Sequence, residues 1–390
     1  MTPLQILSEV VFLLCLVLLI YAYIGYPWIL RLLVRRRINE RLPTGAFHPK
    51  ITVLIPVHNE ERVIRQKLEN CLMQDYPQDR LEIMICSDCS DDRTERIVHS
   101  FLGGNVTFYD YRDRSGKTGV INKSLPKATG EIVILTDANV MFEQGAIQKM
   151  VNFYCSPDIG AVCGQVRLVV PAGAKKIDKE IAYRNFETEL KHLEGLWGST
   201  IGAFGGFYSI RKELFRPLPD VAYNDDILIP MQVLRIGKKV VFEKEAISME
   251  STSLSIQQEF KRRIRIGAGN FQAFFLLRDM LSPSRGMTCF FYFSHKVLRW
   301  FSPFLLLGLI LSNALLIGYL PFAVLFFCQL LFYAVSVAVG ILFSSKERYV
   351  PFLSGAYHFL MMNLAFFLGF LRFCRGIESA AWQTTDRAQG

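Results

Sequence analysis

The hydrophobic residues of this chain gather in two regions, one near the N-terminus and one in the last quarter. Residues 6–33 form an apolar run that is long enough to cross a bilayer as a helix. Further apolar segments follow at 300–318, 320–343 and 352–373, with a polar break at 344–348 between the last two. The pattern predicts membrane helices on both sides of a more polar central region.

Basic residues beside these segments predict their orientation. Arginines at 35–37 follow the first segment, which has no basic leader and no small-residue cleavage site, so we expect a retained anchor with its C-terminal end in the cytoplasm. Three C-terminal crossings would then leave the last residues outside, although Arg372, Arg375 and Arg387 favour the inside. One segment is therefore interfacial or re-entrant, or residues 288–297 add a crossing.

The central region alternates short β-branched runs with segments of helical spacing. Strands are predicted at 51–55, 81–86, 106–111 and 131–135, with helices at 61–73 and 94–101. Such alternation predicts a parallel α/β sheet, in which ligands bind beyond the carboxyl ends of the strands. Further along, the sequence predicts a helix at 181–197, a loop at 202–206, a strand at 207–210 and a helix at 226–236.

Residues 256–278 combine several basic side chains with aromatic and aliphatic ones, which is typical of a helix at the membrane–water interface. The pattern as a whole divides the chain into an anchor, a cytoplasmic α/β domain, an amphipathic interface region, C-terminal membrane helices and a tail. The corresponding boundaries are 1–37, 50–255, 256–287, 288–375 and 376–390.

Composition agrees with this division and argues against one class of partner. The chain is 51% hydrophobic and contains 31 phenylalanines, which is high for a soluble protein. Its formal net charge is +9, but the densest basic clusters, at 35–37, 261–263 and 372–375, each lie beside an apolar segment. That placement indicates anionic lipid at the inner membrane surface rather than nucleic acid.

The nine cysteines do not form the pattern of a metal site. Cys86 and Cys89 form a C-x-x-C pair, but a structural zinc site needs two more ligands at similar spacing, and none follows. The ordinary explanation is two small residues at the end of a strand, and redox chemistry at this pair is the less favoured alternative. Free thiols suit a reducing, cytosolic location for the α/β domain.

Acidic residues follow two of the predicted strands, at the ends where such sheets bind ligands. Asp88 comes after strand 81–86, and Asp137 comes after strand 131–135. One carboxylate can accept hydrogen bonds from a nucleoside, and the other can help to hold Mg²⁺ or Mn²⁺ against a pyrophosphate. Aspartate is also frequent in turns and at helix N-termini, so each position alone has an ordinary structural explanation.

Two further stretches carry candidate chemistry. Residues 116–123 contain glycines and Lys117, which can approach an anionic nucleotide. Their spacing is not that of a phosphate loop, and a solvated loop opening a helix is the alternative. Asp225 and Asp226 precede an apolar helical run, where acids favour the helix dipole. The functional alternative is a general base, because a carboxylate placed beside a substrate hydroxyl can take its proton.

The order of these motifs resembles glycosyltransferase family 2, the inverting enzymes with a GT-A fold. The resemblance extends to the membrane-integrated branch that contains chitin, hyaluronan, cellulose and bacterial exopolysaccharide synthases. The matching stretches are 56–60 for its P-x-x-N-E, 87–94 for its D-D-x-S-x-D-x-T, Lys117 with Asn122 for its K-x-x-x-x-N, 137–139 for its D-x-D, 205–206 for its acceptor-side G-G, and 224–226 for its T-E-D.

The resemblance implies a mixed, mainly parallel α/β sheet, and it assigns roles residue by residue. Asp226 is the implied catalytic base. The residues implied for the nucleotide-sugar donor are Pro56, Val57, Asn59, Glu60, Asp88, Lys117, Asn122, Asp137 and Ala138. Those implied for the acceptor or pyrophosphate are Gly205, Gly206, Asp225, Arg262 and Arg265, and those for a divalent cation, Mg²⁺ or Mn²⁺, are Asp137 and Asn139.

Ser87 replaces the first acid of D-D-x-S-x-D-x-T, and two further departures from the family pattern matter more. Asn139 stands where D-x-D has its second acid, the usual metal ligand, so we expect weaker metal binding. Ile266 stands where the family motif Q-x-x-R-W has its tryptophan, which stacks on the growing chain in processive synthases. The absence of this tryptophan argues against polymer extension. For Arg262 and Arg265, snorkelling at the membrane interface is the alternative to binding a pyrophosphate.

The resemblance implies an integral membrane enzyme, in the bacterial inner or plasma membrane, with a cytoplasmic catalytic domain. The implied reaction moves a sugar from a nucleotide sugar, most often a UDP-sugar, to a glycan or lipid-linked acceptor in polysaccharide, exopolysaccharide or glycolipid synthesis. The alternatives are a processive synthase-translocase, a catalytically impaired regulatory membrane protein that binds nucleotide sugars, and a channel or transporter, against which the ordered acids argue. The sequence leaves the sugar, the linkage and the oligomeric state open.

Overall fold

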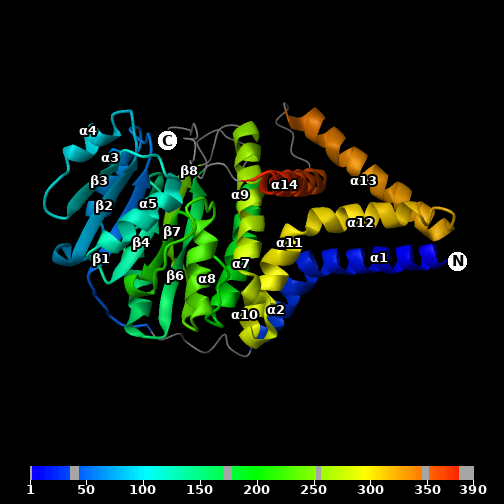
Figure 1. Ribbon diagram of the computed structural model, residues 1–390, viewed down its shortest axis with the longest axis horizontal. Coiled ribbons are helices and arrows are strands. Elements are labelled where there is room, and N and C mark those ends of the chain that lie inside the picture. The colour runs from blue at the N-terminus through cyan, green and yellow to red at the C-terminus, as the bar shows by residue number, and fades with distance from the viewer. Residues whose placement is uncertain (1, 36–43, 170–177, 252–255, 345–350, 377–390) are drawn as a thin grey trace.

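The computed structural model describes residues 2–35, 44–169, 178–251, 256–344 and 351–376. It consists of a sheet domain and a set of apolar helices that project from one side of it (Figure 1). Some sequence-based expectations fall outside the described residues, namely those for Arg36, Arg37, the linker at 38–43, the polar break at 345–348 and the tail from 377 onward.

The sheet domain is built on an eight-stranded sheet within the described residues. The strands are β1 (Ile51–Val57), β2 (Leu81–Asp88), β3 (Val106–Tyr111), β4 (Ile132–Thr136), β5 (Val140–Phe142), β6 (Ile159–Val169), β7 (Phe207–Arg211) and β8 (Lys239–Ser251). Their order is β3-β2-β1-β4-β7-β6-β8-β5. β1, β2, β3 and β4 run parallel to one another, whereas β7 runs antiparallel to both of its neighbours. The sheet is therefore mixed and mainly parallel, as the sequence predicts.

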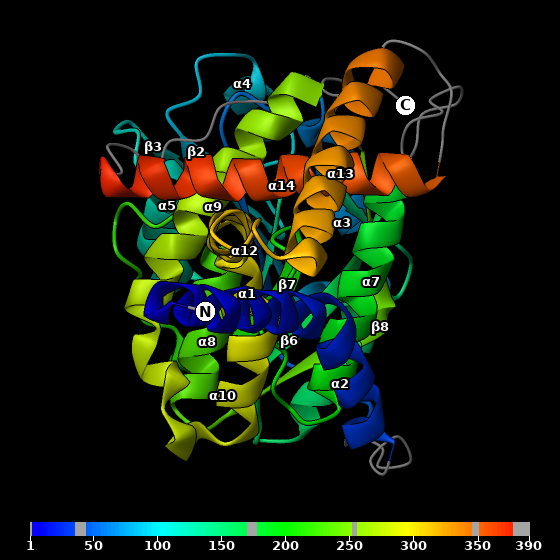
Figure 2. The same ribbon diagram turned by 90° about the vertical axis from the view of Figure 1, so that its right-hand side faces the viewer.

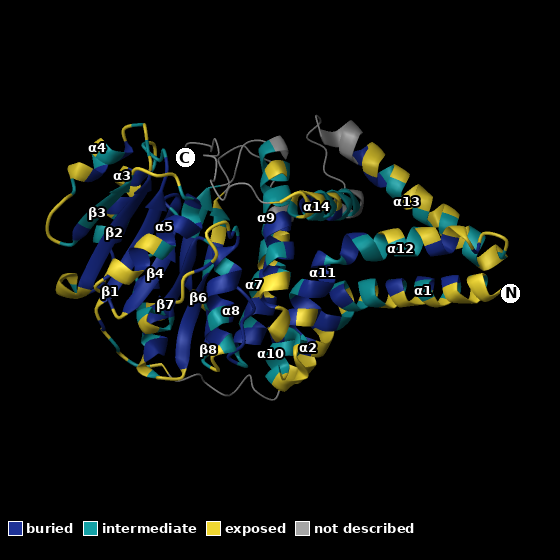
Figure 3. Ribbon diagram, in the orientation of Figure 1, coloured by how far each residue is buried: buried dark blue, intermediate teal, exposed yellow. Residues whose placement is uncertain are grey.

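The central strands are buried along their whole length because they are covered on both faces. Every residue of β1, β2 and β4 is buried, without the alternation of a half-exposed strand. Figure 3 shows these buried strands between helices that keep an exposed face. The helices of the domain are α3 (Ile64–Leu72), α4 (Thr94–His99), α5 (Gly116–Ser124), α6 (Ala146–Val151), α7 (Asp178–Gly195) and α8 (Asp225–Arg235).

The predicted strands are all present, and each of their ends lies within two residues of the predicted position. The sequence does not predict β5, β6 or β8. β6 contains two glycines, and β8 contains several charged residues, so neither shows a clear strand pattern. These two strands are defined mainly by their long parallel pairing with each other, which is a tertiary contact.

The N-terminal apolar run forms one long, locally distorted helix. It consists of α1 (Pro3–Ile20), a π-helical turn at Tyr21–Gly25 and α2 (Tyr26–Val34). The C-terminal part consists of α9 (Ile256–Leu276), α10 (Met287–Phe291), a π-helical segment at Tyr292–Val297, α11 (Leu298–Trp300), α12 (Ser302–Ala314), α13 (Leu320–Ser344) and α14 (Pro351–Cys374). Short 3-10 turns occur at Gln78–Arg80, Leu125–Lys127, Asn152–Cys155, Lys212–Leu214, Arg278–Leu281 and Pro283–Arg285.

Several of these helices satisfy the requirements of a membrane span. Among the described residues, Pro3–Val34, Leu320–Val339 and Gly355–Cys374 are long and apolar enough to cross a bilayer. The pair Met287–Trp300 and Ser302–Ala314, whose axes differ by 60°, would add a fourth span if it acts as one bent helix. The apolar segment predicted at 300–318 is thus shorter and more bent than the sequence suggests.

α14 runs across α1 and α12 rather than beside them. α1 and α12 project away from the sheet domain in Figure 1, where α14 is seen nearly end-on, and Figure 2 shows α14 along its length. α14 packs closely on α9, because a Cβ added at Gly369 would lie 2.8 Å from the backbone of Gly267. Near its C-terminal end, Arg372 lies 3.3 Å from the hydroxyl of Tyr223 in the sheet domain. α14 therefore differs in direction from α1 and α12, and an interfacial position for one C-terminal segment stays a prediction.

A buried polar network joins α7 of the sheet domain to the membrane helices. His295 lies between two glutamates of α7, 3.1 Å from Glu187 and 2.6 Å from Glu194. Tyr26 of α2 donates a hydrogen bond to Glu194 at 2.7 Å. Removing one partner from such a network leaves a buried charge without compensation, so these contacts fix the orientation of the domain on its membrane helices.

Candidate active site

Lys117 lies at the centre of a group of polar side chains at the edge of the sheet. Its Nζ lies 2.9 Å from Asp137 Oδ1 and 3.4 Å from Asp225 Oδ1, and it donates to the carbonyl oxygen of Gly205 at 3.1 Å. Lys117 comes from the first turn of α5, Asp137 follows β4, Gly205 precedes β7, and Asp225 begins α8. Burial opposes the charge of Lys117, but Asp137 and Asp225 raise its pKa above the ordinary value, so it remains an ammonium.

Asp226 lies against the loop before β7. A Cβ added at Gly205 would lie 3.4 Å from its Oδ2, so glycine at this position lets the carboxylate approach the loop backbone. Burial, and then the charge of Asp225, raise the pKa of Asp226 to about 6, although Lys117 acts in the opposite direction. A carboxylate with a pKa near neutrality can accept a proton during a reaction and release it afterwards.

The two adjacent acids of α8 have different surroundings. Asp225 is buried, and its Oδ2 accepts a hydrogen bond of 2.6 Å from the hydroxyl of Tyr208. Its Oδ1 faces Lys117. Asp226 is only partly buried. Asp225 therefore has a fixed set of partners, while Asp226 can still be reached by a substrate hydroxyl.

Asp88 and Asn59 hold the loops that follow β1 and β2. Asp88 is fully buried, and its two carboxylate oxygens accept from the backbone N–H groups of Ser115 at 2.7 Å and Gly116 at 2.9 Å. Asn59 donates to Asp91 Oδ1 at 2.5 Å and accepts from the backbone N–H of the same residue at 2.9 Å. The Asp88 contacts fix the start of α5 and therefore the position of Lys117, and the Asn59 contacts join the loops after β1 and β2. Direct contact with a nucleotide stays a prediction for Pro56, Val57, Asn59, Glu60 and Asp88.

Asn122 and Gly206 have clear structural roles. The amide of Asn122 donates to the carbonyl oxygen of Leu218 at 2.8 Å and accepts from its N–H at 2.9 Å, so it fixes the loop before α8. A Cβ added at Gly206 would lie 2.7 Å from a methyl group of Val140, so glycine is needed there. Ala138 is buried between the polar residues of the D-x-D position. Donor contacts of Asn122 and Ala138, and an acceptor contact of Gly206, stay predictions.

The two arginines predicted for the pyrophosphate differ in their surroundings. Arg262 donates to Glu259 of the same helix at 2.9 Å. Arg265 is half-buried, and burial and then Arg262 lower its pKa, while Asp137 acts in the opposite direction. Arg265 is therefore within electrostatic range of the site, and Arg262 has a carboxylate partner on its own helix. Binding of a pyrophosphate stays a prediction for both.

The residues at 137–139 fit a divalent cation if the substrate shares it. The side chain of Asp137 is 37% exposed, and that of Asn139 is buried with no partner for its Nδ2 among the described residues. Those residues contain no group of three His, Cys, Asp or Glu side chains that could hold a metal by itself. Mg²⁺ usually takes one or two protein oxygens and completes its shell with water and substrate phosphates. Asp137 and the amide oxygen of Asn139 are a suitable pair for that arrangement.

Two buried lysines near the site are not predicted by the sequence. Lys191 of α7 donates to the carbonyl oxygens of Ile201 at 3.2 Å and Gly202 at 2.6 Å, and burial lowers its pKa to about 8. Lys67 of α3 donates to Thr136 Oγ1 at 3.1 Å, and burial lowers its pKa to about 8 as well. In the sequence both resemble ordinary solvated lysines on helices, so no local signal marks them.

The comparisons with known proteins agree with this geometry. Residues 52–218 match the family model described as Glycosyl transferase family 2. Over these residues the chain is similar to a family 2 glycosyltransferase domain. A relative from Bacillus subtilis (strain 168), named probable glycosyltransferase YdaM, is 29% identical over 314 residues, which are 75% of this chain and 69% of that protein.

A second relative is a poly-beta-1,6-N-acetyl-D-glucosamine synthase from Staphylococcus aureus (strain COL), which is 26% identical over 243 residues. The match covers 60% of this chain and 57% of the synthase, so the chain spans less than two thirds of that relative's length. Among solved structures, the mannosyltransferase PcManGT from Pyrobaculum calidifontis, in complex with GDP-Man and Mn²⁺, matches with a TM-score of 0.70 and 21% identity. It covers 93% of this chain and 99% of its own, which establishes the GT-A fold.

Proposed function

We propose that this glycosyltransferase moves a sugar from a nucleotide sugar, most simply a UDP-sugar, to a hydroxyl of a glycan or lipid-linked acceptor, with inversion at the anomeric carbon. The observation that carries the proposal is the pair of contrasting groups at the sheet edge. Lys117 is a permanent cation suited to a departing diphosphate, and Asp226 is a carboxylate with a pKa of about 6 suited to a hydroxyl proton.

The residues would divide the reaction between them. The acceptor oxygen bonds to the anomeric carbon, the bond from that carbon to the diphosphate oxygen breaks, and Asp226 takes the hydroxyl proton. Lys117 places positive charge beside the diphosphate as negative charge develops on it. A cation held by Asp137 and Asn139 would supply further positive charge there. Tyr208 and Lys117 keep Asp225 in place, so that its charge helps Asp226 to remain basic.

A membrane location supports an acceptor that is itself attached to or passed along the bilayer. We place the catalytic domain on the cytoplasmic side, because nucleotide sugars and reduced thiols belong to that compartment and Arg35 follows the first span. All nine cysteines are free thiols. A bacterial inner or plasma membrane agrees with the two bacterial relatives.

A processive synthase is the second candidate, because one relative is named as a polymer synthase. Ile266 of α9 supports single or short additions instead, since an aliphatic side chain offers no stacking surface to a growing glycan. A length analysis of the products separates the two candidates. Discrete products with one added sugar support the first, and long polymers made without release support the second.

The proposed function is tested by supplying membranes that contain the protein with a panel of labelled UDP-, GDP- and dTDP-sugars, with and without Mg²⁺ or Mn²⁺. We expect transfer from one nucleotide class and a loss of transfer on chelation. The matched control is a membrane preparation with the Asp226→Asn variant at equal abundance. Absence of both transfer and donor hydrolysis for every sugar would contradict the proposal.

The Asn139→Asp substitution is expected to reduce the Mn²⁺ concentration needed for half-maximal transfer by about tenfold, because a carboxylate adds a charge to the cation site. The new side chain has the same shape as the amide, whose Nδ2 has no partner to lose among the described residues. Asn139→Ala serves as the control that removes the amide without adding charge. Equal metal requirements for wild type and both variants would remove position 139 from the cation site.

A further inference from the structure

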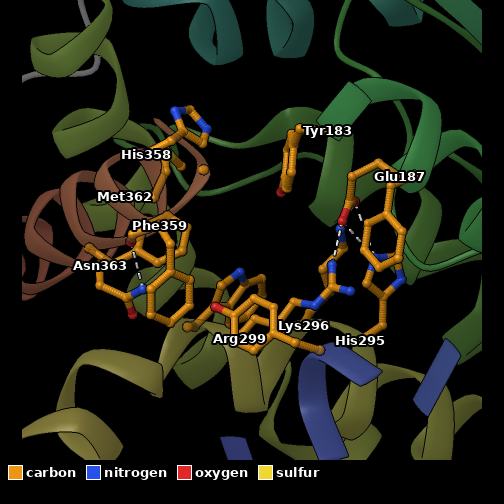
Figure 4. Close-up of a pocket in the computed structure, with 14 residues that line it drawn as sticks. Tyr183, Glu187, His295, Lys296, Arg299, His358, Phe359, Met362 and Asn363 are labelled. Atoms are coloured by element: carbon orange, nitrogen blue, oxygen red, sulfur yellow. Dashed lines mark hydrogen bonds and ion pairs between the residues drawn. The ribbon is translucent and has the colours of Figure 1, made fainter. Parts of the chain in front are cut away.

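A cavity of about 290 Å³ lies where the sheet domain meets the membrane helices. Its wall comes from α7, the π-helical turn before α2, the segment through α11, and α14 (Figure 4). Most of the lining is aromatic or aliphatic, with Tyr23, Phe186, Trp300 and Phe359 as examples. Charged side chains at one end make the cavity amphipathic, so it does not resemble an ordinary packing defect.

Arg299 is the unusual side chain of this cavity. It is 7% exposed, and its Nη1 donates to Glu187, but its Nε and Nη2 have no acceptor among the described residues. The rings of Tyr23 and Phe186 lie 5.6 Å and 5.0 Å from the guanidinium carbon, and they offer no lone pair in the plane of those N–H groups. Buried donors without an acceptor are unfavourable, and an anionic oxygen would satisfy them.

The charges that line the cavity favour an anion. Lys296 lies 2.9 Å from Glu187, which is also the carboxylate partner of Arg299, so two permanent cations share one lining carboxylate. His295 lies between Glu187 and Glu194, and Glu194 faces away from the cavity toward Tyr26. An added phosphate would therefore contact Arg299 and Lys296, two cationic side chains that have only one lining carboxylate, Glu187, between them.

A second, mainly apolar groove shares Asn363 with this cavity and follows α14. It has a volume of about 370 Å³ and lies between α12, α13 and α14, with Leu306, Ile310 and Leu364 among its lining residues. Asn363 of α14 lines both spaces. A ligand that fills them has a charged group at one end and a hydrocarbon chain at the other.

The position of the cavity agrees with the level of lipid head groups. α14 runs across α1 and α12 and packs on α9, so the cavity lies at the surface from which the membrane helices project (Figures 1 and 2). Lys296 at its charged end is also one of the cations that act on Asp226. The charged end of the cavity is therefore in electrostatic range of the proposed base.

We propose that this cavity binds the phosphate of a membrane lipid on Arg299 and Lys296, with the hydrocarbon chain in the groove along α14. Two sources share this chemistry, a phosphate-bearing acceptor lipid and a resident phospholipid. The possibility that the bound lipid is the sugar acceptor rests on the proposed function, because that lipid would have to present a hydroxyl to Asp226. The lipid site itself does not depend on transfer.

The test measures lipid binding to the full chain in detergent by native mass spectrometry, with dioleoyl phosphatidic acid and dioleoylglycerol as probes. The two probes share their hydrocarbon chains and differ in the phosphate. We expect phosphatidic acid to bind at least about tenfold more tightly, and Arg299→Gln to remove most of that difference. Glu187 keeps Lys296 and His295 as partners in this variant, and unchanged thermal melting confirms that it folds.

A second variant adds bulk at the lining of the cavity without touching the charges. A Cβ added at Gly355, which lines the cavity, has no neighbour within 4 Å, so Gly355→Leu places its side chain in open space. Gly318→Leu is the matched control. A Cβ added at Gly318 also has no neighbour within 4 Å, but Gly318 lines neither the cavity nor the groove. We expect Gly355→Leu to weaken phosphatidic acid binding about tenfold or more and Gly318→Leu to leave it unchanged. Equal binding of the two probes, or equal binding by wild type, Arg299→Gln and Gly355→Leu, would overturn the site.

Labelled nucleotide sugar separates the two sources of the lipid. If the bound lipid is the acceptor, the label enters a product that partitions into butanol, and Gly355→Leu reduces this product while hydrolysis of the donor continues. If the lipid is a resident phospholipid, the variant loses phosphatidic acid without a change in butanol-soluble label. Both results support the site. A wild-type protein that binds phosphatidic acid as expected but turns over no donor would contradict the proposed function alone.

Discussion

Replacing Asp226 with asparagine is expected to lower the rate of sugar transfer by about 10³-fold, within the range that general-base catalysis contributes. The amide has nearly the same shape but cannot accept the hydroxyl proton. Lys117, Asp137 and Asp225 keep their mutual contacts in this variant, so binding of the nucleoside diphosphate should stay within about threefold of the wild-type value. The measurements are initial rates with labelled donor and a separate titration of the nucleoside diphosphate.

Asp220→Asn is the matched control, because Asp220 is an exposed aspartate in the loop before α8. It should transfer sugar at the wild-type rate. Normal turnover by Asp226→Asn would remove the base assignment, and a parallel loss of nucleotide binding would assign Asp226 to the donor site instead.

Because the pKa of Asp226 is raised, the rate of sugar transfer should depend on pH. The carboxylate form is the active base, and its pKa is about 6, so the rate should fall as the pH decreases through that value. Burial and Asp225 favour the protonated form, and removal of the neighbouring charge in Asp225→Asn should move the acid limb to lower pH. An acid limb that stays in place in this variant would contradict the electrostatic link between the two acids.

Replacing Lys117 with methionine is expected to lower kcat/KM for the donor by about 10²-fold or more, because several charge-assisted contacts are lost together. The ammonium holds Asp137, Asp225 and the carbonyl oxygen of Gly205 in one group. Without it, two carboxylates face the donor diphosphate uncompensated, and like charges oppose its binding. The decrease in kcat/KM should therefore come mainly from a higher KM for the nucleotide sugar.

Lys123→Met is the matched control for this substitution. Lys123 lies on the same helix, but it is exposed and its Nζ contacts the hydroxyl of Ser115 at 3.2 Å. The Lys123→Met variant tests whether the positive charge of any lysine on α5 is enough to favour binding of the nucleotide sugar. Equal effects of the two substitutions on KM would mean that Lys117 acts at long range only, and the central position assigned to it would be wrong.

The sequence predicts the N-terminal half of the sheet well because that half is locally encoded. Each of β1, β2 and β4 is a mainly apolar run with polar residues at or directly after its C-terminal end, and this pattern can be seen without tertiary information. β6 and β8 differ, since their pairing joins segments that lie far apart in the sequence and contain glycine or charge. Bending of the pair α11 and α12 also depends on packing, so a single straight span is the natural sequence-based expectation.

The sequence predicts which residues belong to the candidate site, but it does not predict how they are arranged. The sequence indicates that Asp137 and Asp226 belong to one site, and Lys117 is a candidate for it. It does not indicate that Lys117 holds Asp137 and Asp225 at the same time, or that Asp88 has both oxygens occupied by backbone N–H groups. These contacts depend on where separate loops end in space.

The membrane junction was the least predictable part of the molecule. His295 appears in the sequence as a lone histidine before an apolar segment, and Glu187 as one of several acids on an amphipathic helix. Only the fold brings them within 3.1 Å and adds Arg299 and Lys296 to the same carboxylate. A buried ionic group of this kind has no periodic pattern, because its partners come from elements more than a hundred residues apart.

The central claim is that Asp226 deprotonates an acceptor hydroxyl that attacks the sugar from the side opposite the diphosphate. The most direct measurement is the anomeric configuration of the first product, determined by NMR in the early phase of a reaction with an α-linked UDP-sugar or the donor identified by the panel. We expect a β-linked product from the α-linked donor. An α-linked first product would contradict it, because retention requires attack on the same face or an intermediate for which Asp226 is not the base.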